Sequence, residues 1–240
     1  MQFSGFQKLT LLDYPEKTAC TLFTAGCNFR CPFCHNAALV THIDNSNYFT
    51  EEYVLDYLKK RKGVIDGVCI TGGEPLMQPE FTLALLKLAK ENGLHTCIET
   101  SGFGKWEVLE EIAPYVDIFL YDFKIGDSTL HKKYTGVENG LIIDNLKKLD
   151  EMGAKTVLRC PIIPDINDNE SHFESILSIA NSLNNLLEIN LEPYHPLGIS
   201  KQERLNKESK YTNREFMDKE KLKSLAGPLV ENANVKVKIM

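Results

Sequence analysis

The sequence contains no apolar run that approaches the roughly 20 residues needed to cross a bilayer. Its opening stretch, MQFSGFQKLTLLDYP, lacks the uninterrupted apolar core of a secretory leader. The composition lacks a basic excess, since 27 Lys and Arg face 33 Asp and Glu, and this excludes the clustered cations of a nucleic-acid-binding surface. No linker or internal repeat interrupts the chain. We therefore expect a cytoplasmic protein with a single domain over residues 1–240 and with no membrane or nucleic-acid partner.

A disulfide framework is also disfavoured. The seven cysteines are an odd number, and a chain without an export signal stays in a reducing compartment. The cysteines are therefore expected to serve metal binding or catalysis.

Strand-like and helix-like segments alternate along the chain. Short β-branched or apolar runs, each bounded by turn residues, predict strands at 18–24, 66–71, 94–98, 116–121, 155–160, 186–192 and in the final VKVKIM. Helix-period segments lie between them at 51–62, 79–92, 105–113, 139–152 and 170–184. Gly93 and Gly153 are the clearest helix stops. The alternation requires parallel pairing with right-handed crossovers, so it predicts a curved or open α/β sheet.

Residues with unusual chemistry fall where the predicted strands end. The segment AGCNFRCPFCHN (25–36) follows the first of these strands, and later strand ends carry TGGEP (71–75), ETSG (99–102), YDFK (121–124), Arg159 and EPYHPLG (192–198). Because the carboxyl ends of parallel strands meet at one edge of a sheet, we expect these motifs to share one rim. The densely charged segment 198–221 is interpreted either as a solvated loop leading into a last helix or as a docking surface for a partner.

The cysteine-rich loop is the strongest single signal. Cys27, Cys31 and Cys34 lie within eight residues, and no second pair completes the four-ligand set of a structural zinc site. A catalytic zinc would recruit a histidine or carboxylate, and His35 keeps that alternative open. A [4Fe–4S] cluster normally takes four cysteines, so three would leave one iron open to a substrate. The remaining cysteines lie in apolar strand-like runs and are interpreted as small buried residues: Cys20, Cys69, Cys97 and Cys160.

The spacing C-x3-C-x2-C, with an aromatic residue before the last cysteine and GGEP one strand later, resembles the radical S-adenosylmethionine (SAM) superfamily. From end to end the chain is similar to the activating enzymes of glycyl radical enzymes, such as those of pyruvate formate-lyase and of anaerobic ribonucleotide reductase. YDFK-x6-HKKYTG and EPYHPLG are part of this likeness. The resemblance implies a partial, open parallel (β/α)6 barrel of the radical SAM type.

The resemblance also implies a reaction. The three cysteines would hold a [4Fe–4S] cluster whose free iron chelates SAM, and an electron from a donor such as flavodoxin or ferredoxin would cleave SAM to a 5′-deoxyadenosyl radical. That radical would abstract a hydrogen from a glycine of a partner glycyl radical enzyme, whose loop an open sheet can admit from the side. A single cluster is expected, because only 37 residues separate Cys34 from Gly72 and Cys69 is the first cysteine among them. We also expect a monomer.

The family's SAM-binding positions match residues of this chain. The resemblance implies contacts with SAM at Phe33, Asn36, Gly72, Gly73, Glu74, Thr100, Asp122, Lys124, Arg159 and His195. Gly72 and Gly73 would let the backbone approach the methionine end of SAM, where a side chain would block it. Lys124 is implied to act in catalysis with the three cysteines, and Asp122 to help bind a monovalent cation. Glu99 departs from the aspartate that the family frequently has at this cation site.

Two alternative functions fit parts of the pattern. A radical SAM enzyme that acts on a small molecule, as in the synthesis of 7-carboxy-7-deazaguanine, would keep the cluster, but the match of HKKYTG and EPYHPLG speaks against it. A non-catalytic iron–sulfur or zinc module would yield no deoxyadenosine from SAM under reducing conditions.

Overall fold

The computed structural model describes residues 3–41, 49–61, 63–204 and 211–240. The chain divides into two compact units, one of residues 1–28 and 39–119 and the other of residues 29–38 and 120–240. The division falls inside the cysteine-rich loop, again between Ala38 and Leu39, and a third time inside strand β5 (Ile118–Asp122). The single domain expected over residues 1–240 stays a prediction.

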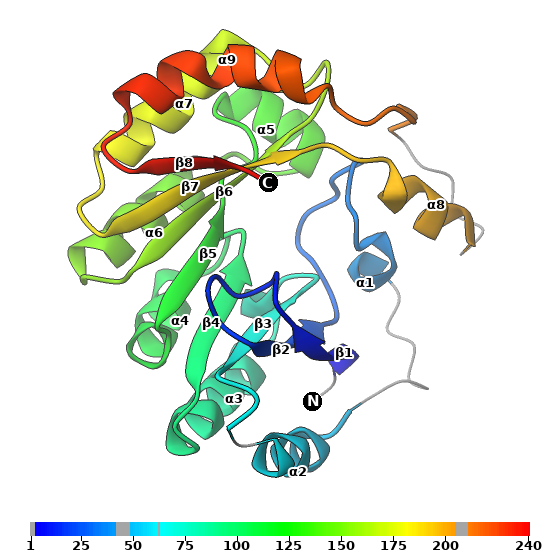
Figure 1. Ribbon diagram of the computed structural model, residues 1–240, viewed down its shortest axis with the longest axis vertical. Coiled ribbons are helices and arrows are strands. Elements are labelled where there is room, and N and C mark those ends of the chain that lie inside the picture. Colours follow the sequence, from blue (N-terminus) through cyan, green and yellow to red (C-terminus); the bar gives the residue numbers. More distant parts are fainter. Residues whose placement is uncertain (1–2, 42–48, 62, 205–210) are drawn as a thin grey trace. The chain divides into compact units, whose positions relative to one another are not determined.

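The first unit is an α/β unit whose strands lie in sequence order, and in Figure 1 it runs from blue to green. Its strands are β1 (Phe3–Thr10), β2 (Ala19–Thr24), β3 (Gly67–Gly72), β4 (His95–Thr100) and the start of β5. β1 pairs with β2 in the antiparallel direction, whereas β2, β3 and β4 are parallel. Helices and 3₁₀ turns follow or precede these strands: α1 (Ala37–Thr41, which begins in the second unit), α2 (Glu51–Lys60), η1 (Pro75–Met77), α3 (Pro79–Glu91), α4 (Trp106–Ile112) and η2 (Ala113–Tyr115).

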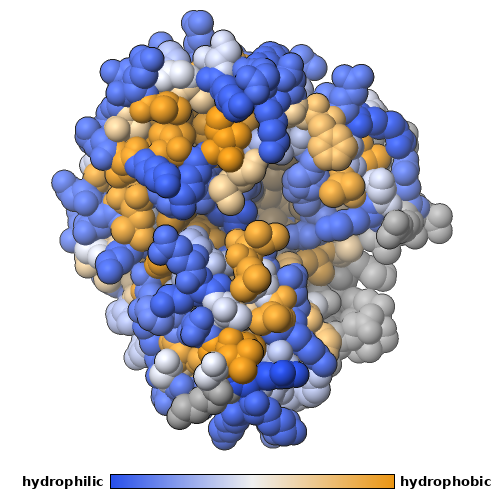
Figure 2. Space-filling view, in the orientation of Figure 1, coloured by the Kyte–Doolittle hydropathy of each residue, from blue (hydrophilic) through white to orange (hydrophobic). Residues whose placement is uncertain are grey.

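A ladder of aliphatic side chains forms the core of the first unit. Leu22, Ile70 and Ile98 lie side by side in register on β2, β3 and β4, and each is fully buried. Burying a side chain of this size stabilises the fold by about 1.5–3 kcal/mol. Helix α2 is amphipathic, with Val54 and Leu58 buried, and Figure 2 shows hydrophilic side chains over its outer face. This packing holds the carboxyl ends of the three parallel strands in a fixed order.

The second unit continues the alternation from the end of β5 to the C-terminus, in green through yellow to red in Figure 1. Its further strands are β6 (Thr156–Ile162), β7 (Leu186–Pro193) and β8 (Lys236–Ile239); β6 pairs with β7, and β7 with β8, in the parallel direction. Its helices are α5 (Ser128–Thr135), α6 (Gly140–Glu151), α7 (Glu170–Asn181), α8 (Leu197–Arg204) and α9 (Lys219–Asn232). The expected open parallel α/β sheet is confirmed.

Glycine ends two of the helices as the sequence predicts. Gly93 follows α3 with φ +73° and Gly153 follows α6 with φ +79°. A residue with a Cβ is strained in this left-handed conformation, so glycine is favoured one position past the end of a helix. Each of these turns is followed by a predicted strand.

The interpretation of residues 198–221 as one loop is wrong at both ends. α8 begins at Leu197, with Ile199 and Gln202 buried, and α9 already starts at Lys219. Residues 205–210, like residue 62 at the end of a predicted helix, lie outside the described residues. That this segment docks a partner stays a prediction. None of the helices in the described part of the chain has the length and apolar character that a membrane crossing requires.

Candidate active site

The cysteine-rich loop follows β2, as expected. Cys27, Cys31 and Cys34 form no disulfide and are partly exposed, and the backbone N–H of Cys34 donates to the carbonyl of Cys31 (3.3 Å) in a tight turn. The remaining cysteines are fully buried in strands, as predicted: Cys20, Cys69, Cys97 and Cys160. Exposure therefore separates the three candidate ligands from the rest of the thiols.

Backbone packing in the first unit requires glycine at both positions of the pair Gly72 and Gly73 at the end of β3. A Cβ on Gly73 would lie 2.0 Å from the carbonyl oxygen of Gly26. Gly72 has φ +127°, and a Cβ there would lie 2.2 Å from the backbone nitrogen of Thr24. Two backbone bonds use this proximity: Gly73 N–H donates to the Thr24 carbonyl (2.9 Å) and Glu74 N–H donates to the Gly26 carbonyl (2.8 Å). The GGEP loop is thus hydrogen-bonded to the residues just before Cys27. This role is additional to the SAM contact that the sequence implies for these glycines.

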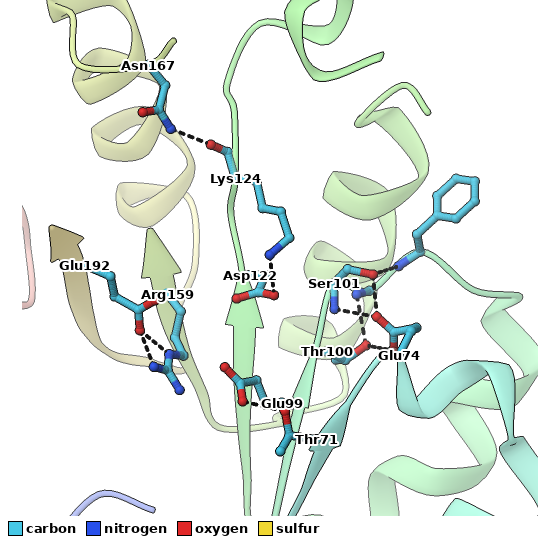
Figure 3. Close-up of polar contacts among 12 residues, drawn as sticks. Thr71, Glu74, Glu99, Thr100, Ser101, Asp122, Lys124, Arg159, Asn167 and Glu192 are labelled. Carbon is cyan, nitrogen blue, oxygen red and sulfur yellow. Dashed lines mark hydrogen bonds and ion pairs between the residues drawn. The ribbon is translucent and has the colours of Figure 1, made fainter. Parts of the chain in front are cut away.

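Glu74 is a buried acid whose carboxylate is held by a neighbouring loop (Figure 3). One oxygen accepts from the backbone N–H of Leu76 (3.1 Å) and the hydroxyl of Thr100 (2.6 Å). The other accepts from the N–H (2.8 Å) and the hydroxyl (2.5 Å) of Ser101. Burial raises the pKa of Glu74, although these hydrogen bonds oppose the rise. Glu74 therefore joins the loop after β3 to the loop after β4; its contact with SAM, like that of Thr100, stays a prediction.

Glu99 accepts a hydrogen bond from the hydroxyl of Thr71 (2.6 Å), across β3 and β4 (Figure 3). Its carboxylate is thereby oriented on the strand end that the sequence assigns to the cation site. Binding of a cation there stays a prediction.

Asp122 and Lys124 form an ion pair at the end of β5 in the second unit, with 2.8 Å between Nζ and Oδ2 (Figure 3). Their side chains are only 16% and 19% exposed, so this is not the solvated surface pair that an arbitrary D-x-K would form. Burial alone lowers the pKa of Lys124, but the charges of Asp122, Cys31 and Cys34 outweigh it and raise the pKa above its usual value. Lys124 therefore carries a positive charge close to two of the candidate ligands.

The same electrostatics act on the thiol of Cys34. Burial raises its pKa, and the backbone N–H of Asn36 and the ammonium of Lys124 oppose this rise in part. The backbone of Asn36 thus lies beside the last cysteine of the loop, and contact of Asn36 with SAM stays a prediction.

Asn167 fixes the backbone at Lys124 (Figure 3). Its buried amide donates to the carbonyls of Lys124 (2.7 Å) and Pro161 (2.8 Å), and its Oδ1 accepts from the N–H of Ile163 (2.6 Å). Nothing in the sequence around Asn167 distinguishes it from other loop asparagines, so sequence reasoning missed it.

Replacing Asn167 by aspartate is expected to lower the free energy of unfolding by about 3 kcal/mol. The carboxylate would face the carbonyls of Lys124 and Pro161 without a proton to donate. Urea unfolding of the metal-free protein measures the loss. Asn181→Asp is the matched control, because Asn181 is exposed and donates to one carbonyl at the surface. Equal stability of the two variants would contradict the role given to Asn167.

The predicted place of Arg159 at a strand end is wrong. Arg159 lies in the middle of β6, because the strand continues through Pro161 to Ile162, and its guanidinium forms an ion pair with Glu192 of β7 (Figure 3). Both side chains are about three-quarters buried. The carboxylate of Glu192 holds the guanidinium between adjacent strands, and contact of Arg159 with SAM stays a prediction.

Aromatic rings and histidines line a hollow in the second unit. Phe33 is buried and meets Tyr211 edge-on, with 6.5 Å between ring centroids, and Tyr211 in turn meets Tyr194. The imidazoles of His35 and His195 are stacked at 4.0 Å. Together with Gln202 and neighbouring backbone, these side chains form the walls. Burial lowers the pKa of His35 to about 4 and also lowers the pKa of His195. The structure thus brings the predicted residues Phe33 and His195 to one hollow.

Several residues of these sites carry too weak a sequence signal to be found. Ser101 lies inside the ETSG motif, where no sequence pattern marks it as a donor to Glu74, and Tyr211 lies in a charged segment. Asn28, directly after Cys27, donates to the carbonyl of Phe103 (2.7 Å). Only contacts over long sequence separations reveal these partners.

The model of the Radical SAM superfamily matches residues 21–176. The chain belongs to the radical SAM superfamily. It is 37% identical to the pyruvate formate-lyase-activating enzyme of Clostridium pasteurianum, over 95% of this chain and 96% of the relative. It is 35% identical to the isethionate sulfite-lyase activating enzyme of Nitratidesulfovibrio vulgaris, over 81% of this chain but only 62% of that relative. A solved domain of a pyruvate-formate lyase-activating enzyme from Bacteroides vulgatus is 27% identical, with a TM-score of 0.61, and the match covers 72% of this chain and 98% of the domain.

Radical SAM enzymes use a [4Fe–4S] cluster and SAM. Among the described residues, no three His, Cys, Asp or Glu side chains stand together as a metal centre. Cys27 belongs to the first unit, and Cys31 and Cys34 belong to the second. Three partly exposed thiols outside disulfides, two of them beside the ammonium of Lys124, suit a cluster that needs thiolates. Superfamily membership favours the cluster over zinc, and the ring of His35 lies against His195.

Proposed function

We propose that this radical SAM protein activates a glycyl radical enzyme by removing a hydrogen atom from a glycine of that partner. The observation that carries the proposal is the 37% identity to a pyruvate formate-lyase-activating enzyme over nearly the full length of both chains. The isethionate sulfite-lyase activating enzyme is a further relative that is named for an activating function. We infer that the partner is pyruvate formate-lyase or another glycyl radical enzyme, and that flavodoxin or ferredoxin supplies the electron.

The residues of this chain have separate roles in the proposal. Cys27, Cys31 and Cys34 would hold the cluster, which supplies the electron that cleaves SAM into methionine and the hydrogen-abstracting 5′-deoxyadenosyl group. Lys124 would attract the carboxylate of SAM and Asp122 would hold the lysine in place, as their ion pair supports.

In the same proposal, the hollow of the second unit would hold the nucleoside end of SAM. Phe33 and His195 would bind the nucleoside end of SAM, since an aromatic face and an imidazole nitrogen suit adenine and ribose. Both line a hollow next to the last ligand, Cys34.

The proposal is tested with anaerobically reconstituted protein, SAM, a reductant and each glycyl radical enzyme encoded by the source organism. We expect 5′-deoxyadenosine and, with the correct partner, a glycine-centred doublet in the electron paramagnetic resonance spectrum. If the partner is prepared with α-deuterated glycine, deuterium should appear in the 5′-deoxyadenosine. A partner whose reactive glycine is replaced by alanine is the control and should give no doublet.

Two results would reject the proposal at different levels. Deoxyadenosine without a glycyl radical in any candidate partner would favour the small-molecule alternative. If protein that carries its cluster forms no deoxyadenosine, it does not cleave SAM and the whole proposal is wrong.

A further inference from the structure

The stacked histidines join the cysteine-rich loop to the segment after β7. The rings of His35 and His195 are parallel within 7° and their centroids are 4.0 Å apart. Nε2 of His35 lies 3.3 Å from the backbone carbonyl oxygen of His195, and because a carbonyl can only accept, this nitrogen carries the proton. All of these atoms belong to the second unit. His195 is therefore held twice by the residue that follows Cys34.

A glycine keeps the two segments in contact. A Cβ on Gly198, at the start of α8, would lie 3.1 Å from both the carbonyl oxygen of Cys34 and Cδ2 of His35. Real Cβ atoms rarely approach so closely, so the chain between His195 and α8 packs directly on the backbone of the loop. The stack is thus part of a tight contact between the segments.

The ring of His195 has a polar atom left for a ligand. Its Nδ1 is buried and has no hydrogen-bond partner among the residues that the structure describes. A buried nitrogen without a partner costs free energy, so such an atom is better satisfied when a ligand is bound. The ring lines the hollow with Phe33 and Tyr211. Its orientation is set by His35 and by the backbone.

We propose that His35 is a positioning residue that orients His195 for SAM. It acts through the ring stack and through the hydrogen bond to the His195 carbonyl. Through these contacts, His35 connects its neighbour Cys34, the last proposed cluster ligand, to His195, the proposed SAM-binding imidazole. This inference rests on the proposed SAM chemistry of the site.

Three variants separate the two contacts. His35→Ala removes both, His35→Phe keeps an aromatic face, and His35→Gln keeps an amide donor without a ring. Stacking and a hydrogen bond of this kind are together worth about a tenfold change in affinity. We expect about tenfold weaker SAM binding for His35→Ala and recovery to within about threefold of wild type for His35→Phe. KM for SAM should rise more than kcat falls. His95→Ala, at a half-exposed position in the first unit, is the control and should leave SAM binding unchanged.

A second readout needs neither cluster nor SAM. The chain has only six histidines, so the ring protons of His195 can be assigned by nuclear magnetic resonance in the metal-free protein with a His195→Gln variant. The ring of His35 should shift these signals upfield. We expect the shift to persist in His35→Phe and to vanish in His35→Ala and His35→Gln.

Two outcomes would overturn the proposal. Unchanged His195 signals in His35→Ala would mean that the rings are not stacked in solution. Moved signals with unchanged SAM affinity and KM would leave His35 a purely structural role. If His35→Ala does not fold, the comparison of His35→Phe with His35→Gln decides by the same criteria. Failure of the proposed function is recognised separately, because wild-type protein would then produce no deoxyadenosine.

Discussion

Replacing Cys31 by alanine is expected to reduce SAM cleavage to background and to prevent retention of the [4Fe–4S] cluster. The same result is expected for Cys27 and Cys34, because a cluster that keeps only two protein thiolates loses iron and offers no ordered open position to SAM. The measurements are iron and sulfide content after anaerobic reconstitution, and 5′-deoxyadenosine formed with a reductant.

Cys20→Ala is the matched control for these variants. Cys20 is fully buried in β2 as a small apolar residue, so its loss should cost about 1 kcal/mol of stability and leave the cluster in place. Turnover with an intact cluster in any one of the three loop variants would overturn the assignment of that cysteine as a ligand.

Replacing Gly73 by alanine is expected to lower the free energy of unfolding by about 3 kcal/mol or more. The new Cβ would lie 2.0 Å from the Gly26 carbonyl oxygen and 2.6 Å from its carbon, and backbone cannot give way as a flexible side chain can. Separation of the two loops would break the hydrogen bonds from Gly73 to Thr24 and from Glu74 to Gly26. Urea unfolding of the metal-free protein and the Kd for SAM of the reconstituted protein measure both consequences.

Gly227→Ala shows what the same substitution does where there is room. Gly227 lies inside α9, and a Cβ there meets nothing within 4 Å. The net change in the free energy of unfolding should stay within about 1 kcal/mol. The backbone freedom that alanine removes favours the helix, whereas Pro228, which follows directly, disfavours the helical conformation of a residue with a Cβ. Similar stability changes at Gly73 and Gly227 would show that the close approach in the first unit is absent in solution.

Strands β2 to β7 were predictable because each contains a short β-branched or apolar run, and β8 because apolar residues alternate with lysine in it. β1 was missed, since FSGFQKLT mixes polar residues with glycine and lies beyond the strand–helix alternation; its pairing with β2 is antiparallel and irregular. α1 was missed because it is only five residues long, and α5 and α8 because each has eight residues and few apolar positions. β6 was predicted too short because Pro161 usually ends a strand.

The candidate site was predictable in its residue types but not in its contacts. Clustered cysteines, GGEP and D-x-K are local patterns that a sequence displays directly. Glu74, by contrast, finds its donors 26 and 27 residues further on, and His35 meets a residue 160 positions away. Such partners depend on which loops the folded strands bring together, and sequence spacing contains no such information.

The carboxylate of Glu74 has consequences for anyone building chimaeras of these enzymes. Three of its four donors come from Thr100 and Ser101 in the ETSG segment, and the fourth is the backbone N–H of Leu76, directly after GGEP. Grafting residues 71–75 from a homologue therefore transfers the carboxylate without the residues 99–102 that donate hydrogen bonds to it. Exchange of residues 71–75 and 99–102 as a single cassette is the design that leaves no buried acid unmatched.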